Sequence, residues 1–218
     1  MIKLSLRLQT IADLVSKEDN VIDVGCDHAL LSIYITNKYQ KKVYASDLRE
    51  GAIKQAEKNI KKYNIEGIVL KQGNGLEIVS NKKINTVIIA GMGCQTIINI
   101  LNNPKRKQLS KLLIQSNNDY YSLRKKICHL GYYIYEEKII KDGHYYLIID
   151  FRKGKKKYNY QDYYFGPILR KNKSRTYINY YKYLLNQKKS IKHNIPIKYF
   201  LKRYKLSKEI NRIKKEIN

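Results

Sequence analysis

The segment from residue 21 to residue 35, VIDVGCDHALLSIYI, constrains the fold of this chain more than any other. An apolar run, a single glycine and an Asp-His pair precede a second apolar stretch with helical spacing. This order predicts a strand, a tight turn at Gly25 and a helix whose first N–H groups face a ligand. Such a unit is typical of the first strand of a doubly wound parallel sheet, which binds ligands at its carboxyl edge.

The second predicted strand ends in an acid, Asp47. A carboxylate there accepts hydrogen bonds from both hydroxyls of a ribose held over the first turn, so together with Asp23 and Gly25 it predicts a nucleoside ligand. A dinucleotide would require more glycines than the one in this turn. Asp27 repels a pyrophosphate but accepts from an ammonium group, so S-adenosyl-L-methionine fits better than a nicotinamide or flavin dinucleotide.

The remaining pattern alternates strands with helices and ends in two strands around Asp142-Gly143, a hairpin turn. We expect further strands at 42–47, 67–72, 84–90, 111–115, 132–139 and 144–151. We expect further helices at 3–15, 50–63, 95–101 and 121–130. The predicted fold class is therefore α/β, a Rossmann-like doubly wound sheet with an antiparallel terminal hairpin.

Two glycine-rich turns follow strands of this sheet. Gly73-Asn74-Gly75 suits a close turn beside a flat ring, where Asn74 offers its amide to the edge of an adenine. Gly91-Met92-Gly93 follows the central strand and leaves space where a methyl group meets its acceptor. A turn with a structural role alone is the alternative for both.

Positive charge is concentrated in the last third of the chain. Residues 151–218 hold 21 Lys and Arg against three acids, a net charge of +18, whereas residues 1–150 hold 23 against 15, a net charge of +8. This excess predicts a polyanionic partner, either nucleic acid or an anionic membrane surface. Residues 158–167 are aromatic and turn-rich, and two helix-like segments follow at 174–192 and 197–217. There, lysines and arginines would neutralise phosphates while some of the ten tyrosines of residues 151–218 stack on bases. For most of these tyrosines, packing within the protein is the alternative.

The three cysteines, Cys26, Cys94 and Cys128, lack the spacing of metal ligands or of a disulfide framework. We therefore expect free thiols, a reducing compartment and no metal. The first fifteen residues are too polar for a signal peptide, and no apolar run is long enough to span a membrane. These features predict a soluble cytoplasmic protein with no membrane partner and no obligate protein partner.

Six motifs, in this order and spacing, resemble the bacterial tRNA (adenine-N1)-methyltransferases that act at position 22 of tRNA. They are DVGCDHALL, SDLREGAI, GNGLE, IAGMGCQTI, LLIQSN and EEKIIKDGHYYLIID. The resemblance covers residues 1–151 and extends more loosely through FGPIL at 165–169 and the helical tail. It implies a class I methyltransferase domain that binds S-adenosyl-L-methionine, predicted at 1–153, and a basic helical domain that binds tRNA, predicted at 154–218.

The resemblance also implies which residues surround the cofactor. They are Asp27, His28, Asp47, Asn74, Gly75, Gly91, Met92 and Gly93, beside Asp23 and Gly25 of the first turn. The sequence departs from the family pattern at four positions, Cys26, Asn74, Cys94 and Ser116. Because Asn74 replaces an acid, it donates as well as accepts hydrogen bonds, and cofactor affinity is expected to differ.

Methylation of adenine N1 needs alignment and exclusion of water more than acid–base groups, because N1 carries a neutral lone pair. We expect the catalytic residues Gln115 and Asn117 to lie near the target base. Candidate contacts to the RNA are Arg7, Lys155, Lys156, Arg170 and Arg175. Two alternatives stay open: a methyltransferase for a small molecule or another RNA, and a protein without enzymatic activity that binds RNA or a membrane surface.

Overall fold

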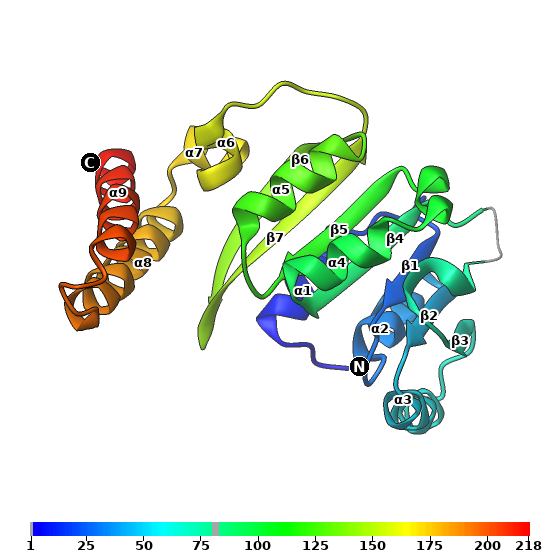
Figure 1. Cartoon of the computed structure of the whole chain (residues 1–218). Helices are drawn as coiled ribbons and strands as arrows, with labels where there is room; N and C mark the ends of the chain where they lie inside the picture. The colour runs from blue at the N-terminus through cyan, green and yellow to red at the C-terminus, as the bar shows by residue number, and fades with distance from the viewer. Residues whose placement is uncertain (1, 80–82) are drawn as a thin grey trace. The chain divides into compact units, whose positions relative to one another are not determined.

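The computed structural model describes residues 2–79 and 83–218, which form two compact units, one ending at Arg170 and one running from Lys171 to Asn218. Within these residues, the first unit contains a seven-stranded sheet in the order β3-β2-β1-β4-β5-β7-β6 (Figure 1). Its strands are β1 (Val21–Val24), β2 (Val43–Asp47), β3 (Ile68–Gln72), β4 (Thr86–Met92), β5 (Lys111–Ser116), β6 (Tyr132–Asp142) and β7 (His144–Lys153).

Strands β1 to β5 are parallel, and β7 lies antiparallel between β5 and β6. This topology confirms the predicted doubly wound sheet with a terminal antiparallel hairpin. The strand order reverses between β1 and β4, and the crevice beyond the carboxyl ends of these strands is where open α/β sheets bind ligands.

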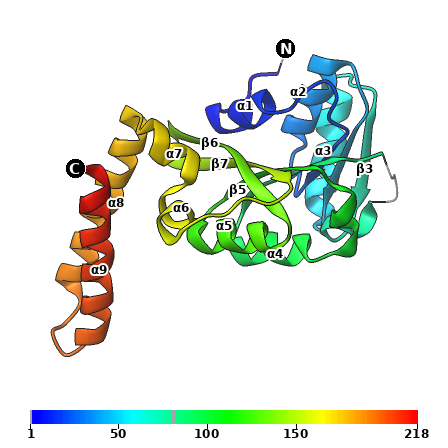
Figure 2. The same cartoon turned by 90° about the horizontal axis from the view of Figure 1, so that it is seen from above.

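Helices cover both faces of the sheet, and Figure 2 shows α4 and α5 on the opposite side from α1 and α2. The helices of this unit begin with α1 (Leu6–Asp13), α2 (Leu30–Tyr39), α3 (Glu50–Lys62), α4 (Cys94–Leu101) and α5 (Tyr120–His129). Two short 3-10 helices, η1 (Gly75–Ile78) and η2 (Pro104–Gln108), follow β3 and α4. The observed helices lie within or close to the predicted ranges, and α1 starts later because the Oγ of Ser5 caps it.

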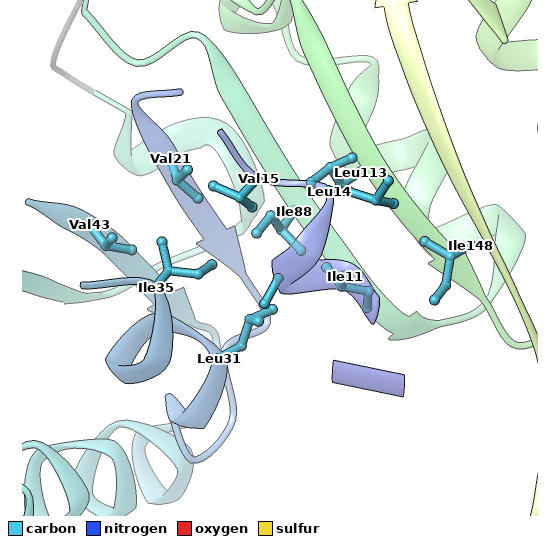
Figure 3. Packing of buried hydrophobic residues seen from close by; sticks show 11 residues of the cluster. Ile11, Leu14, Val15, Val21, Leu31, Ile35, Val43, Ile88, Leu113 and Ile148 are labelled. Carbon is cyan, nitrogen blue, oxygen red and sulfur yellow. The ribbon is translucent and has the colours of Figure 1, made fainter. Parts of the chain in front are cut away.

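A buried hydrophobic cluster packs α1 and α2 against the sheet (Figure 3). Ile11 of α1 and Leu31 of α2 belong to the same cluster as Ile88 of β4 and Leu113 of β5. Full burial of such a side chain stabilises the fold by about 1.5–3 kcal/mol. The cluster therefore fixes the helices that flank the carboxyl edge of the sheet.

Strand β4 continues through Gly91 and Met92, beyond the predicted end of the strand at residue 90. Its pairing with β5 shifts register between Ala90 and Met92, and Gly91 has a positive φ of 79°. A bulge of this kind re-aims the side chains at the end of a strand. Gly91 and Met92 are consequently part of the sheet edge rather than of a loop that follows it.

The boundary between the units lies after Arg170, whereas the charge pattern predicted it after residue 153. The reason is a buried ion pair of the first unit, in which Nε of Arg124 lies 2.7 Å from Oε1 of Glu137. Arg124 also donates to the carbonyl oxygen of Tyr163 at 3.0 Å, and the backbone N–H of Ile168 donates to Oε2 of Glu137 at 3.1 Å. The segment after residue 153 thereby supplies hydrogen bonds to both members of a buried pair.

This segment is also helical, although its composition predicted turns. It forms α6 (Tyr160–Phe165) and α7 (Pro167–Asn172). The side chain of Asn159 accepts from the N–H of Asp162, and the carboxylate of Asp162 accepts from the N–H of Asn159, which makes a capping box. Such a box stabilises the first turn of a short helix.

The second unit is a hairpin of two helices, α8 (Arg175–Asn194) and α9 (Phe200–Ile217), near the two predicted ranges. Its buried side chains come from both helices, namely Tyr177, Tyr181 and Leu185 from α8 and Ile210 and Ile213 from α9. The hydroxyl of Tyr177 donates to Oε1 of Glu216 at 2.9 Å. Ile195-Pro196 separates the helices because proline cannot continue a helix that precedes it.

Candidate functional site

A cavity of about 860 Å³ lies at the carboxyl edge of β1, β2 and β4. Nine of the ten predicted cofactor residues line it. They are Asp23, Gly25, Asp27, His28, Asp47, Asn74, Gly75, Gly91 and Met92. Gly93, the tenth, does not line the cavity; it precedes α4, near the side chain of Asn118. The sheet thus brings together residues that are up to 69 positions apart in the chain.

Asp47, at the end of β2, is held by backbone groups around it. Its Oδ2 accepts from the N–H of Asp27 at 3.2 Å, and its Oδ1 accepts from the N–H of Arg49 at 2.9 Å. Asp47 is almost completely buried, yet it lines the cavity. Oδ1 also accepts from Nε of Arg49 at 3.3 Å, whereas Oδ2 keeps a second lone pair, so Asp47 is oriented and its Oδ2 can accept from a ligand.

Asp23 is buried behind the first turn and accepts a hydrogen bond of 2.8 Å from the hydroxyl of Ser32. Burial raises the pKa of Asp23 to about 6, the Ser32 hydrogen bond opposes the shift, and the charge of Asp47 adds to it. A positively charged ligand in the cavity would favour the ionised form of Asp23. The site therefore suits a cation better than an anion.

The first turn brings backbone close to the cavity. Gly25 has a positive φ of 76°, and a Cβ at this position would lie 2.1 Å from Cε of Met92. The N–H groups of Gly25 and Cys26 both donate to the carbonyl oxygen of Ser46, at 2.8 and 2.9 Å. This turn is therefore locked to β2, and its positive φ favours glycine; Cε of Met92, at the end of a flexible side chain, could move away from a Cβ.

Asn74 lines the cavity and is exposed, with its Nδ2 donating to Oε1 of Glu77 at 3.4 Å. Leu48, which the sequence interpretation did not select, also lines the cavity, although 64% of it is exposed. An apolar side chain left open beside a cavity offers a surface to a flat ring. Its position directly after Asp47 was the feature of the sequence that could have predicted Leu48 as a site residue.

Other lining residues that were not predicted come from α4 and the residues after it. They are Thr96, Asn99, Ile100 and Asn103. Thr96 lies within the IAGMGCQTI motif, but Asn99, Ile100 and Asn103 follow that motif and belong to none. Only the packing of α4 beside η1 places them at the cavity.

Gln115 is 1% exposed and does not line the cavity. Its Oε1 accepts from Nη1 of Arg7 at 2.8 Å and from the N–H of Gly91 at 3.0 Å. Its Nε2 donates to the carbonyl oxygen of Ser116 at 2.9 Å and to Oδ1 of Asn117 at 3.2 Å. The amide is thus engaged within the protein, and Gln115 holds Arg7 and the β4 bulge in place.

Asn117 is exposed and binds the same bulge. Its Nδ2 donates to the carbonyl oxygen of Gly91 at 2.7 Å, and its backbone N–H donates to that of Met92 at 2.9 Å. Arg7 lines the cavity, and its guanidinium carbon lies 5.4 Å from the ring centre of Tyr146. Arg7, Gln115 and Asn117 therefore form one network around Gly91. Their parts in catalysis and RNA binding stay predictions.

The other predicted RNA contacts do not line the cavity. Lys155 and Lys156 are exposed, and Nζ of Lys156 lies 4.2 Å from the ring centre of Tyr133. Arg170 is half-buried and forms an ion pair with Asp162 at 3.0 Å. Arg175 is exposed at the first position of α8, in the second unit. Their role stays a prediction.

Cys26 forms part of the cavity wall and is a free, buried thiol. Burial raises its pKa, and the carboxylates of Asp23 and Asp47 raise it further. Among residues 2–79 and 83–218, no three His, Cys, Asp or Glu side chains are arranged to hold a metal ion. Across the same residues, none of the helices combines the length and hydrophobicity that a membrane crossing requires.

A family model described as a methyltransferase domain matches residues 4–149. The solved structure of M. capricolum TrmK in complex with S-adenosyl-homocysteine has 33% sequence identity and a TM-score of 0.87, over 98% of this chain and 97% of that one. The chain belongs to the TrmK family of methyltransferases.

Two further comparisons agree with TrmK family membership. The tRNA (adenine(22)-N(1))-methyltransferase of Bacillus subtilis (strain 168) is 28% identical over 205 residues, which cover 89% of this chain and 86% of the relative. Streptococcus pneumoniae Sp1610, solved with S-adenosyl-L-methionine, is 28% identical with a TM-score of 0.90, over 99% of this chain and 100% of that one. The resemblance that the motifs indicated is confirmed.

Two departures from the TrmK family pattern lie at the junction of β5 and α4. Ser116 donates from Oγ to the carbonyl oxygen of Asn118 at 2.8 Å. Oδ1 of Asn118 in turn accepts from the N–H of Cys94, the first residue of α4, at 2.9 Å. A hydrogen-bonded serine therefore closes the turn after β5.

Proposed function

We propose that this chain transfers the methyl group of S-adenosyl-L-methionine to N1 of the adenine at position 22 of tRNA, in the cytoplasm. The observation that carries the proposal is the cavity, where Asp23, Asp27 and Asp47 converge beside the glycine turn of β1. Relatives that align along most of the chain support it, since one is named for this reaction and another was solved with the cofactor.

The residues of the cavity fit this cofactor. S-adenosyl-L-methionine is a cation with a ribose, an ammonium group and no phosphate. Four carboxylate residues line the wall against two arginines, and this negative excess matches those positive charges, whereas it would repel the pyrophosphate of a dinucleotide. Gly25 and Gly75 both have positive φ, and glycine at these positions keeps the cavity floor free of side chains. The bound cofactor supplies an electrophilic methyl group on a sulfonium.

Four cavity residues are assigned to different parts of the cofactor. Asp47, fixed by two backbone N–H groups, accepts from the ribose hydroxyls. Asn74 offers its amide to the adenine edge, and Leu48 offers an apolar surface to its flat face. Asp23 holds negative charge behind the first turn and so favours a cationic ligand.

The network around Gly91 would position the target base. Gln115 and Asn117 bond Gly91 of the β4 bulge directly, and Arg7 donates to Gln115, so the sheet edge where methyl and acceptor meet is held in place. No general base is needed, because adenine N1 attacks with a neutral lone pair and carries no proton to remove. Rate enhancement then comes mainly from alignment. Since N1 is on the pairing edge, the base must be unpaired before it reacts.

The tRNA part of the proposal is supported by charge. The last 68 residues carry a net charge of +18, which a small-molecule acceptor would not require. Exposed Lys155, Lys156 and Arg175 are the candidate phosphate contacts. Arg170 is a weaker candidate, because a phosphate would compete with Asp162 for its guanidinium.

The test is methyl transfer from labelled S-adenosyl-L-methionine to total bacterial tRNA that lacks this modification, followed by nuclease digestion and nucleoside mass analysis. We expect new 1-methyladenosine, and a transcript of a substrate tRNA with guanine in place of the target adenine should accept no label. Cofactor binding without transfer to tRNA would indicate a small-molecule acceptor or another RNA. Absence of cofactor binding would refute methyl transfer altogether.

A further inference from the structure

The tip of the α8–α9 hairpin, which we define as residues 186–208, carries large apolar side chains that nothing in the hairpin covers. Of the twelve such side chains that are exposed in the described residues, six lie between 191 and 204. They are Ile191, Ile197, Tyr199, Phe200, Leu201 and Tyr204, with exposed fractions from 53% to 82%. Isolated exposed apolar residues are ordinary, but six in one short segment mark an interaction surface.

The hairpin does not need these side chains for its own stability. Its buried residues lie nearer the opposite end, at positions 177–185 of α8 and 210–216 of α9. An ion pair between Lys188 and Glu209 joins the two helices where the tip begins. The apolar residues beyond this pair are therefore available to a partner.

The tip has a defined conformation. Nη1 of Arg203 donates to the carbonyl oxygens of Lys192 and Ile195, at 2.9 and 2.5 Å. The N–H of Tyr199 donates to the carbonyl oxygen of Pro196 at 3.0 Å. Because these bonds fix the turn between the helices, little ordering entropy remains to be lost when a partner binds.

The charge of the tip selects the class of partner. Residues 186–208 contain eight lysines and arginines and no aspartate or glutamate. Nζ of Lys198 lies 5.4 Å from the ring centre of Tyr199, and Nζ of Lys208 lies 4.6 Å from that of Tyr204. Protein interfaces are depleted in lysine at their cores. Cations placed beside aromatic rings instead match a polyanion that also has flat faces, which is single-stranded nucleic acid.

We propose that the tip binds unpaired nucleotides of the RNA substrate, with bases stacked on Tyr199, Phe200 and Tyr204 and phosphates neutralised by the neighbouring lysines. The inference rests on the proposed function and adds an RNA contact that is separate from the cavity residues. Since every base has a flat face, this contact selects exposed bases in loops rather than a sequence.

The test compares the full chain with a variant that carries Tyr199→Leu, Phe200→Leu and Tyr204→Leu, which removes the rings and keeps apolar side chains. Fluorescence anisotropy with an unmodified tRNA transcript should show binding about tenfold weaker or more, as expected for the loss of base stacking. The slope of log affinity against log salt should not change, because the lysines remain. Affinity for S-adenosyl-homocysteine, measured by calorimetry, should also be unchanged.

Two matched variants complete the design. Tyr63→Leu removes an exposed ring from the first unit and should leave tRNA affinity unchanged. A variant with Lys198→Gln, Lys202→Gln and Lys205→Gln should reduce the salt slope by about 2 to 3, at roughly 0.7–0.9 for each phosphate that is no longer neutralised. Circular dichroism melting checks that each variant is folded.

Three results would overturn the proposal. If the wild-type chain methylates tRNA and the three-leucine variant binds tRNA equally well, the tip makes no stacking contact, while the proposed function stands. If the wild-type chain binds no tRNA, both proposals fail. If the variant loses binding to phosphatidylglycerol vesicles, or self-association in sedimentation, but keeps its tRNA affinity, the occupant of the tip is a membrane or a second copy.

Discussion

Asp23, Asp27 and Asp47 line the same cavity but are held in different ways. Asp23 is buried against Ser32, whereas Asp47 is bound by backbone N–H groups. Asp27 is exposed, and its carboxylate lies 3.3 Å from Nη2 of Arg49. Burial raises the pKa of Asp23, whose carboxylate accepts a hydrogen bond from the Ser32 hydroxyl. Without a ligand, burial of the ionised Asp23 carboxylate therefore costs free energy, and a cationic ligand reduces this cost.

The first prediction concerns Asp23→Asn and pH. The pKa of Asp23 is raised from 3.8 to about 6, so the folded state binds its proton more tightly than the unfolded state. The free energy of unfolding of the wild type therefore decreases as pH rises from about 4 to 6, because the folded state loses a proton that it binds tightly. Above pH 6 the contribution of Asp23 is about 3 kcal/mol lower than below pH 4. Asparagine does not titrate, so the melting temperature of the variant minus that of wild type should increase between pH 4.5 and 7.5.

Thermal melts without cofactor at several pH values measure this difference. Asp150, whose pKa burial also raises to about 6, titrates in both proteins and cancels in the comparison. Parallel curves for the two proteins would contradict the assignment.

The second prediction concerns Asp47→Asn. The substitution keeps the volume of the side chain but removes the charge that accepts from the ligand hydroxyls. Hydrogen bonds to a charged group contribute about 1.5–3 kcal/mol, so affinity for S-adenosyl-homocysteine should fall by about 10- to 100-fold in calorimetry. Asp13→Asn is the control, since Asp13 is an exposed acid on α1 paired with Lys38. An unchanged affinity in a folded Asp47 variant would remove Asp47 from the site.

The sequence predicted those site residues whose chemistry depends on local spacing. Gly25 and Asp47 follow successive strands, and parallel strands bring their carboxyl ends to one edge. Gln115 ends a predicted strand and belongs to the LLIQSN motif, but its hydrogen bonds were not predictable, because its partner Arg7 lies 108 positions away on a helix. Gln115 was predicted near the target base, whereas the structure shows its amide fully engaged in holding Arg7 and Gly91.

At the scale of elements, periodicity predicted the strands of the sheet and most of its helices. It did not predict where the first unit ends. The run of lysines after residue 152 resembles a linker, and composition carries no information about Arg124 and Glu137, whose buried pair draws the next segment onto the first unit. The tertiary contact with this ion pair determines where the first unit ends, and the lysine-rich sequence does not.

The third prediction tests that contact through Gly166. This residue has a φ of 90°, and a Cβ there would lie 2.5 Å from Oε2 of Glu137. Gly166→Ala should therefore destabilise the folded state in two ways. The strained backbone costs about 1–2 kcal/mol, and disruption of the buried Arg124–Glu137 pair costs about 3–5 kcal/mol more. Free energies of unfolding in urea measure the destabilisation.

Gly131→Ala is the matched control. Gly131 has a φ of 93°, and a Cβ there would meet nothing within 4 Å, so its substitution should cost the strain alone. Equal destabilisation in the two variants would show that Glu137 moves aside without cost.

At the scale of the whole molecule, the fourth prediction separates the two units. A chain that ends at Asn172 keeps α7 and the hydrogen bonds of Tyr163 and Ile168 to the Arg124–Glu137 pair. It should bind S-adenosyl-homocysteine like the full chain but bind tRNA at least tenfold more weakly, because most of the +18 segment is gone. Calorimetry and anisotropy measure the two affinities. Normal tRNA affinity would place the RNA site within the first unit.

A chain that ends at residue 157 provides the contrast. It lacks the Tyr163 carbonyl and the Ile168 N–H that satisfy the buried pair, so it should melt at a lower temperature than the chain ending at Asn172. Equal melting temperatures would show that the boundary predicted from charge is the better one.

The environment of the cysteines, including Cys26 in the cavity wall, determines how readily they are oxidised or alkylated. Burial raises the pKa of Cys26 and of Cys94, and it raises that of Cys128 to about 12. Peroxides and alkylating agents attack the thiolate, and a raised pKa lowers the fraction of each cysteine that is in this form at neutral pH. The native protein should therefore resist oxidation and alkylation at its cysteines. The cavity, with Cys26 in its wall, needs no reductant to stay intact.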